Sequence, residues 1–245
     1  METPFLRNEM LWGEDAQRRL AASHVLLVGL GGVGSYTAEC LVRSGIGELT
    51  IVDRDTVSVT NRNRQLEALA STVGQNKTDA VSARLRDINP ELRLHPLCAS
   101  YDAAHRDLFF PAGCRYDYVV DAIDLVSCKL DLAETALRLE IPIVMALGTG
   151  NKLDPAQLRL ADIAETSGCP LARVMRRELR RRGIEHLRVV FSPEQPAAAG
   201  AGPEAPPPGR HSVPASSPWV PAVAGLLLGS AVVRDLIEKE RDRSC

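Results

Sequence analysis

A glycine-rich loop and the acid that follows it have the residue types needed to bind a nucleotide. The loop reads Gly29-x-Gly31-x-x-Gly34, with a further glycine at Gly32, and it follows an apolar run typical of a buried strand. Such glycines permit a tight turn, close approach of backbone to phosphate, and close packing of a helix whose first N–H groups face the anion. Asp53 ends the next apolar run and can accept hydrogen bonds from both ribose hydroxyls. The pattern predicts a nucleotide site, and NAD, FAD and ATP fit it equally.

Charged residues further along the chain favour ATP. Arg64 offers a planar guanidinium for phosphate oxygens, and Lys77 adds a second positive charge at the start of a predicted helix. Asp124 follows a predicted strand and has the chemistry to hold Mg²⁺, which prefers one or two carboxylates together with substrate phosphates. The negative charge at the far end of ATP must be neutralised before its α-phosphorus is attacked. An NAD-dependent dehydrogenase would leave these three residues unexplained.

Alternating apolar and amphipathic segments must position these residues. Buried strands are expected over 24–28, 49–52, 92–97, 118–122 and 143–146, and weaker strands over 158–161 and 189–191. Helices are expected over 13–22, 34–44, 76–88, 129–139 and 219–240, with an arginine-rich helix between the two weaker strands. This alternation predicts an α/β fold: a Rossmann-like, doubly wound, mostly parallel sheet with helices on both faces and a C-terminal extension of the sheet.

The chain of 245 residues is long enough for one domain that carries an insertion. Within a single domain over 1–245, we expect a nucleotide-binding core over 13–150 and a basic helix with extra strands over 151–192. Residues 193–218 hold eight of the sixteen prolines and almost no large apolar side chains. Such a segment buries too little to offset its ordering entropy, so we expect a flexible loop there. A helix over 219–240 is expected to pack back on the sheet.

Composition narrows the class of protein further. Lys and Arg total 29 against 31 Asp and Glu, so any nucleic-acid surface must be local. The six cysteines form no Cys-x-x-Cys pair, which argues against structural zinc and for free thiols in a reducing compartment. The apolar run from Trp219 to Val233 is interrupted by Pro221 and Ser230, and it indicates a buried helix or a dimer surface more than a membrane span. We expect a cytoplasmic protein, and peripheral contact with the inner membrane stays open.

The chain resembles the ThiF/MoeB/HesA group of adenylating enzymes, in the ubiquitin-activating-enzyme-like superfamily. The matching segments are Gly29–Gly34, Val52–Asp55, Thr60–Gln65, Lys77 and Asp121–Asp124. By this resemblance the nucleotide site comprises Gly29, Gly31, Gly32, Gly34, Asp53, Asp55, Asn61, Arg64, Gln65, Lys77 and Asp124, with Asp124 as the metal ligand. The resemblance also implies that Arg64, Lys77 and Asp124 act in catalysis. Arg7 aligns with an arginine that such dimers insert into the partner's ATP site, although a solvated surface residue is an equal alternative for it.

Within the superfamily, Ile46-Gly47, Arg62-Asn-Arg-Gln65 and Ile88-Asn-Pro90 are most similar to the branch of tRNA threonylcarbamoyladenosine dehydratases. That resemblance implies ATP-dependent cyclisation of N6-threonylcarbamoyladenosine beside the tRNA anticodon. The threonine carboxylate would be adenylated, and the neighbouring carbamoyl oxygen would close the ring. It implies ATP and Mg²⁺ as cofactors, tRNA as a partner and a homodimer. Alternatives are adenylation of the C-terminal glycine of a ubiquitin-like sulfur-carrier protein and a catalytically idle scaffold; missing zinc cysteines disfavour the first, and the charged site disfavours the second.

The cysteines give no indication of a covalent step. Some relatives carry a cysteine in the loop before the last helix, and here the stretch Ser212–Trp219 contains none. A thioester or sulfur relay through that loop is therefore not expected, and a sulfur-transfer partner stays open. Cys169 and Cys128 are interpreted as small packing residues. None of the five histidines falls within a motif.

An arginine-rich helix provides a candidate surface for tRNA. Its basic stripe, at helical spacing on one face, consists of Arg173, Arg176, Arg177 and Arg180. Leu171, Val174 and Leu179 are expected on another face. On a chain of near-neutral charge with few neighbouring acids, such a stripe suits phosphate contacts that weaken as salt rises. A solvated amphipathic helix is the alternative. Aromatic residues are scarce nearby, so recognition of shape and backbone is expected more than base readout.

Overall fold

In the described part of the chain, seven strands form one sheet in the order β3-β2-β1-β4-β5-β7-β6. The computed structural model describes residues 3–198, 200 and 214–238. The strands are β1 (His24–Val28), β2 (Glu48–Val52), β3 (Arg93–Leu97), β4 (Tyr118–Asp121), β5 (Ile143–Ala146), β6 (Arg159–Asp162) and β7 (Arg188–Phe191). All neighbours pair in parallel except β6 and β7, which are antiparallel. The winding therefore reverses between β1 and β4, and open sheets of this kind bind ligands at the carboxyl ends of the strands beside such a point.

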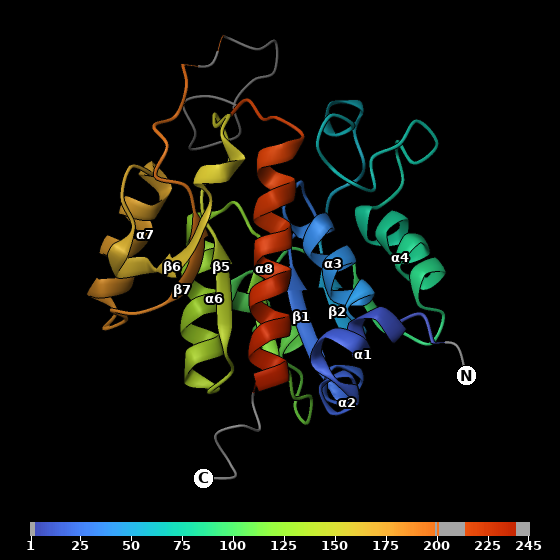
Figure 1. The fold of residues 1–245 in the computed structure, drawn as a ribbon. Helices are drawn as coiled ribbons and strands as arrows, with labels where there is room; N and C mark the ends of the chain where they lie inside the picture. Colours follow the sequence, from blue (N-terminus) through green and yellow to red (C-terminus); the bar gives the residue numbers. More distant parts are fainter. Residues whose placement is uncertain (1–2, 199, 201–213, 239–245) are drawn as a thin grey trace.

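Helices cover both faces of the sheet (Figure 1). One face carries α2 (Glu14–Ala22), α3 (Gly34–Arg43), α4 (Lys77–Ile88) and α8 (Trp219–Glu238). The other carries α5 (Arg106–Phe109), α6 (Val126–Arg138) and α7 (Pro170–Arg181). The short helix α1 (Leu6–Trp12) contacts α2. Short 3-10 turns lie at Val59–Asn61, Ala103–His105, Pro155–Gln157 and Ile163–Glu165.

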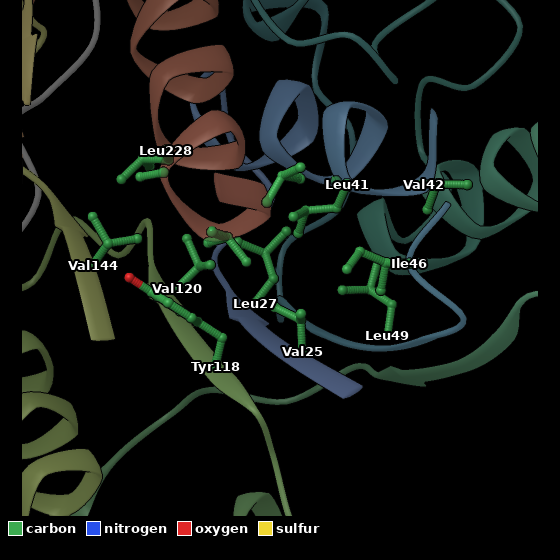
Figure 2. Close-up of a cluster of buried hydrophobic side chains, with 14 of the residues drawn as sticks. Val25, Leu27, Leu41, Val42, Ile46, Leu49, Tyr118, Val120, Val144 and Leu228 are labelled. Atoms are coloured by element: carbon green, nitrogen blue, oxygen red, sulfur yellow. The ribbon is translucent and has the colours of Figure 1, made fainter. Parts of the chain in front are cut away.

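Alternate strand residues divide the core into two layers, because successive side chains of a strand point to opposite faces. Figure 2 shows Val25 and Leu27 of β1 beneath Leu41 of α3 and Leu228 of α8, all in one buried cluster. The intervening residue Leu26 belongs to the other cluster, together with buried residues of α6 and α7. Each such side chain contributes about 1.5–3 kcal/mol by leaving water. The two layers fix the sheet between its helices, and with it the loops at the carboxyl edge.

The last helix, α8, packs tightly on α3. The Thr37 hydroxyl donates a hydrogen bond to the Gly225 carbonyl at 3.0 Å. A Cβ at Gly225 would lie 2.3 Å from the Val33 carbonyl oxygen, so a larger residue would separate the two helices. By length and composition α8 could cross a membrane, and among the described residues it is the one helix that meets this test. Its apolar window is 56% buried within the protein, so packing on the sheet and α3 accounts for much of its apolar character.

The flexible loop predicted over 193–218 lies partly outside the described residues, which lack 199 and 201–213. Its described ends meet at Asn151, in the turn after β5. The Asn151 N–H donates to the Ala215 carbonyl, the Ala215 N–H donates to Asn151 Oδ1, and the Ala197 N–H donates to the Asn151 carbonyl, each at 2.7 Å. Both ends of the proline-rich segment are thus hydrogen-bonded to the same residue.

The predicted fold class is confirmed: the sheet is mostly parallel, helices lie on both faces, and β6 and β7 extend it. The expected strands and longer helices agree with the observed ones to within a few residues. The structure adds α1, which ends at Gly13 (φ +89°), and the four-residue helix α5. Both are too short to produce a clear helical period in the sequence.

Candidate nucleotide site

The glycine-rich loop joins β1 to α3 at the carboxyl edge of the sheet. Gly29 has a φ of +96°, and its N–H donates to the Val52 carbonyl at 2.8 Å, beside the end of β2. A Cβ on Gly29 would lie 2.6 Å from the Ala122 carbonyl oxygen, and one on Gly34 would lie 1.8 Å from the Gly29 carbonyl oxygen. Either side chain would force the loop apart. The N-terminus of α3 therefore lies directly against the sheet, where its N–H groups can meet an anion.

Asp53 and Lys77 lie next to this loop. Asp53 Oδ2 accepts the Leu30 N–H at 2.7 Å, and Oδ1 accepts the Asp55 N–H at 2.8 Å. Lys77 is the first residue of α4, and its Nζ lies 3.0 Å from Asp55 Oδ2 and 4.0 Å from Asp53 Oδ2. Its side chain is 6% exposed. One nearly buried ammonium thus faces two carboxylates at the end of β2, and Asp53, expected to meet a ribose, also holds the glycine loop in place.

Arg64 lies on the outer side of the same loop. A Cβ on Gly32 would lie 3.3 Å from both Arg64 Cγ and the Arg64 carbonyl oxygen, so the two residues are in contact. Arg64 Nη1 donates to the Thr60 carbonyl and to Asn63 Oδ1, both at 2.9 Å. Both hydrogen bonds are made by Nη1, and they hold the Arg64 guanidinium beside the glycine loop.

Asn61 and Gln65 flank Arg64 and contribute differently from each other. Asn61 Oδ1 accepts the Ser58 N–H at 3.0 Å in a capping box, so this side chain shapes the turn that carries Arg64. Gln65 is 7% exposed, and its Nε2 lies 3.7 Å from the Cβ position of Gly31. The buried Gln65 Oε1 has no hydrogen-bond partner among the described residues. An orphaned acceptor under the glycine loop fits a ligand that brings a hydrogen-bond donor.

Asp124 is exposed in the loop that follows β4. The Ala122 N–H donates to the Val28 carbonyl at 2.9 Å, which places this loop at the same carboxyl edge as the glycine loop. Asp124 and Gly29 therefore lie on neighbouring segments of the sheet edge. The predicted metal ligand is thus on the ligand-bearing side of the fold.

A buried ion pair supports the Asp124 loop from below. Lys129 Nζ lies 3.0 Å from Asp121 Oδ2, and both side chains are fully buried. Lys129 Nζ also donates to the Ile123 carbonyl at 3.0 Å, while the Ile123 N–H donates to Asp121 Oδ1 at 2.9 Å. Burial raises the pKa of Asp121, and Lys129 opposes that rise. The sequence prediction missed this pair, although Lys129 is a charged residue on the otherwise apolar face of α6 with Leu132 and Ala136, which is a detectable signal.

Glu67 is a second residue that the sequence prediction missed. It is 2% exposed, and neither carboxyl oxygen has a hydrogen-bond partner among the described residues. Burial raises the pKa of Glu67 to about 7, opposed by its own N–H, Lys77 and Ser35, whereas Asp53 adds to the rise. The Ser35 hydroxyl donates to the Gly31 carbonyl at 2.8 Å and so is engaged by the glycine loop. No pattern in the surrounding sequence distinguishes Glu67 from a surface acid.

The sequence matches one family model over nearly the whole chain. The ThiF family model matches residues 5–238. The chain belongs to the ThiF family. A relative from Bacillus subtilis, tRNA threonylcarbamoyladenosine dehydratase, is 41% identical over 242 residues, which cover 96% of this chain and 94% of the relative.

Among solved structures, this ThiF-family chain is again similar to a tRNA threonylcarbamoyladenosine dehydratase. The crystal structure of E. coli tRNA N6-threonylcarbamoyladenosine dehydratase in complex with ATP has a TM-score of 0.86 and 34% identity, and it covers 99% of this chain and 96% of that chain. A more distant relative, molybdopterin-synthase adenylyltransferase from E. coli, is 35% identical over 130 residues, or 53% of this chain and 51% of the relative. The likeness to the dehydratases therefore extends through α7 and α8, whereas the likeness to the adenylyltransferase covers about half of the chain.

Arg7 of this ThiF-family chain lies apart from the other predicted site residues. It is exposed on α1, and its neighbour Asn8 donates from Nδ2 to the carbonyl of Arg43 at 2.8 Å. Arg43 is the last residue of α3, and Gly34 at the glycine loop is the first. A helix of this length spans about 15 Å, so Arg7 lies at the far end of α3 from the phosphate loop. Within one chain the structure does not bring Arg7 into the site.

The basic stripe on α7 differs in part from expectation. Arg173 and Arg180, which we call the exposed pair, are solvent-exposed, but Arg176 Nη1 donates to the carbonyl and hydroxyl of Thr166, both at 2.6 Å. Glu178 is paired with Arg177 and Arg181 of this helix and with Arg182, its C-cap. Glu178 is the acid within the arginine run itself, and among the stripe residues it pairs with Arg177. The expected apolar face is also shifted: the buried residues are Ala172, Met175 and Leu179, not Leu171 and Val174.

Two cysteines occupy helix starts. Cys169 is 4% exposed, and its Sγ accepts the Ala172 N–H at 3.5 Å as the N-cap of α7. Cys128 Sγ donates to the Tyr101 carbonyl at 3.0 Å in the first turn of α6. Burial raises the pKa of Cys128, which disfavours its reactive thiolate.

Proposed function

We propose that this protein binds ATP at the carboxyl edge of its sheet and uses it to cyclise N6-threonylcarbamoyladenosine in tRNA. The observation that carries the proposal is the meeting of four segments at one edge. The glycine loop, Asp53, Lys77 and Asp124 converge there, and Arg64 contacts Gly32. The relatives named tRNA threonylcarbamoyladenosine dehydratase support the choice of substrate, since they match through α7 and α8 as well as through this edge.

The residues at this edge suit adenylation. The N–H groups at the start of α3 would hold phosphate oxygens, with Arg64 and Lys77 neutralising the triphosphate. Lys77 is already held by Asp55 at 3.0 Å, which keeps its ammonium in position before ATP arrives. The orphaned Gln65 Oε1 would accept a hydroxyl of the nucleotide, and Asp53 would accept another. This pre-organisation is what a reaction driven by positioning and charge neutralisation requires.

The reaction would proceed in two displacements. A carboxylate oxygen of the threonyl group attacks the α-phosphorus of ATP, and the bond to the β-phosphate breaks, which releases pyrophosphate and leaves an acyl-adenylate. The carbamoyl oxygen of the same nucleoside then attacks the activated carbonyl carbon, AMP departs, and one proton is lost as the ring closes. The nucleophile in both steps belongs to the substrate, so no cysteine of the protein is needed. The net change in the nucleoside is the loss of one water.

The donor set at this edge also fits Mg²⁺. Asp124 presents an exposed carboxylate beside the glycine loop, and Mg²⁺ is commonly held by one or two carboxylates together with substrate phosphates. Asp124 would hold the ion, which supplies charge neutralisation at the phosphates when bound. The protein's own contribution is the buried pair Lys129–Asp121, which fixes the loop that carries Asp124.

Assembly and location belong to the same proposal. Because Arg7 lies at the far end of α3, it would reach a nucleotide by crossing into a second copy of the chain, as the family resemblance implies for a homodimer. Exposed Leu6, Met10 and Leu11 on α1 are consistent with such a contact. The basic stripe would bind tRNA phosphates, chiefly through its exposed pair. We place the protein in the cytoplasm, where its tRNA substrate is found.

Mass spectrometry of tRNA nucleosides tests the proposal directly. Incubation of modified tRNA with the protein, ATP and Mg²⁺ should reduce the mass of the threonylcarbamoyl nucleoside by one water. Asp124→Ala and Arg64→Ala should each lower this rate by at least about 100-fold without unfolding the chain. Matched controls are Asp107→Ala and Arg86→Ala, which remove the same charges from exposed positions on α5 and α4. Unmodified nucleoside with the wild-type protein, or full activity in both site variants, would overturn the proposal.

A further inference from the structure

Three potential metal ligands lie at the opposite edge of the sheet from the glycine loop. His24 and Glu48 are the first residues of β1 and β2 and are paired in the sheet register. His95 lies on β3 opposite Thr50, two residues after Glu48 on β2. Since residues two apart on a strand share a face, all three side chains project from the same face of the sheet. They come from positions far apart in the sequence, so no spacing pattern could reveal them.

The separations between their donor atoms suit one small cation. Glu48 Oε1 lies 2.9 Å from His95 Nε2 and 3.6 Å from His24 Nδ1, and all three donor atoms lie within 4.8 Å of one another. In a tetrahedral zinc site with bonds of 2.0–2.1 Å, neighbouring ligand atoms are about 3.3 Å apart. The two separations from Glu48 Oε1 bracket this value, and side-chain adjustments that bring the two imidazole nitrogens to a similar separation would let all three atoms bind one ion.

The hydrogen bonds around the cluster leave its donor atoms facing inward. His24 Nε2 lies 2.9 Å from Thr50 Oγ1. When Nε2 donates to Thr50, the other ring nitrogen, Nδ1, carries a lone pair. His24 Nδ1 lies 3.6 Å from Glu48 Oε1, which is too far for a hydrogen bond, so this lone pair is available to a metal ion. The Glu48 carboxylate is oriented through its other oxygen, because Arg93 donates to Oε2 from Nη2 at 2.8 Å and from Nε at 3.0 Å. Outer contacts of this kind commonly orient metal ligands.

We propose that His24, Glu48 and His95 bind a zinc ion that links the starts of β1 and β2 to the middle of β3. Two imidazoles and one carboxylate are a zinc-type donor set, whereas Mg²⁺ and Ca²⁺ prefer oxygen ligands throughout. The His95 side chain is 50% exposed, so water can reach the fourth position. This zinc site departs from the expectation of no structural zinc, which rested on the cysteines.

The site is separate from the nucleotide edge. Strand β1 has five residues and the glycine loop starts at the next one, Gly29, so His24 lies about 16 Å from the start of that loop. Bound zinc should therefore affect stability and leave the ATP reaction largely unchanged. Glu48 and Asp117 place two carboxylates near His24, which would offset part of the zinc charge, whereas the nearby Arg93 guanidinium opposes them.

Zinc titration of the full-length protein tests the proposal. The protein is stripped with a chelator, its thiols are blocked so that the cysteines cannot bind metal, and ZnCl₂ is added against a competing zinc indicator. We expect one tight equivalent per chain and a higher melting temperature. His95→Gln should weaken zinc binding by at least about 10-fold and remove the thermal shift. The matched control is His105→Gln, at another exposed histidine beside an acid, which should keep both.

Further measurements distinguish loss of the zinc site from loss of folding and from zinc binding by cysteines. His95 and its neighbour Arg93 lie on a partly exposed edge strand, so His95→Gln should fold, and circular dichroism of the metal-free variant checks this. Cobalt in place of zinc should give a spectrum of nitrogen and oxygen ligands without a thiolate charge-transfer band. Equal zinc affinity in His95→Gln and His105→Gln would refute the site, as would the absence of any tight equivalent after the thiols are blocked.

Discussion

Glu67 allows a quantitative test of the electrostatics beside the nucleotide site. Its carboxyl is 2% exposed and lacks a hydrogen-bond partner among the described residues, and burial raises its pKa from 4.5 to about 7. Glu67→Gln keeps the size of the side chain and removes its charge. The folded protein holds this proton more tightly than the unfolded chain does. Stability should therefore fall as the pH rises from about 4.5 to about 7, because the unfolded state releases the proton first.

The magnitude follows from the two pKa values. They differ by about 2.5, and each pKa unit corresponds to 1.36 kcal/mol, so the cost of holding ionised Glu67 in the fold is about 3 kcal/mol. This cost is absent below about pH 4.5 and complete above about pH 7. Relative to wild type, the free energy of unfolding of Glu67→Gln should thus increase by about 2–3 kcal/mol between about pH 5 and about pH 8.

Denaturant unfolding at a series of pH values measures this difference. Other titrating groups contribute equally to wild type and variant, so they cancel in the comparison. Glu185→Gln, at an exposed position, is the matched control and should give a flat difference. A flat difference for Glu67→Gln as well would refute the reasoning. Because Lys77 interacts with Glu67, ATP binding should also weaken as the pH passes about 7, and less so in the variant; isothermal calorimetry would detect this.

Three further predictions concern the tRNA face, the Asp124 loop and the assembly. Replacing the exposed pair of the basic stripe with glutamine should reduce the slope of log K against log salt for tRNA binding by about 2, because each arginine would neutralise one phosphate of the tRNA; an unchanged slope would exclude that face. Lys129→Met should lower the free energy of unfolding by about 3–5 kcal/mol in denaturant melts, because it leaves Asp121 buried and unpaired, and adding Asp121→Asn should restore most of it. If Arg7 acts in a partner's site, mixing inactive Arg7→Ala and Asp124→Ala chains should restore part of the turnover, and no recovery after subunit exchange would count against a shared site.

The sequence predicted the sheet and its edge well because these depend on strong local signals. The run Val25–Val28 consists of valine and leucine, and Gly29 and Asp53 follow successive strands, so the topology alone brings them together. A glycine loop between a strand and a helix is itself a specific pattern. These features do not depend on side-chain contacts between distant residues, so the sequence alone predicts them.

The remainder of the site depends on packing that the sequence does not encode locally. Glu67 is buried because the segment after Arg64 folds back beside Ser35, and a single acid in a short loop has no period to indicate burial. Arg176 looked like part of an open basic surface, but Thr166 from a preceding turn binds it. In both cases the deciding neighbour belongs to another element of the fold, Ser35 of α3 for Glu67 and Thr166 before α7 for Arg176.

The buried pair beneath the Asp124 loop has a consequence for how this protein can diverge. A substitution of Lys129 alone, or of Asp121 alone, leaves an uncompensated charge in the interior of the protein. Few domains of ordinary stability stay folded with such a charge. Descendants should therefore keep both residues or exchange both within a short evolutionary interval. The two positions should accordingly covary more tightly than their separation in the sequence would suggest, even in lineages where the reaction itself is lost.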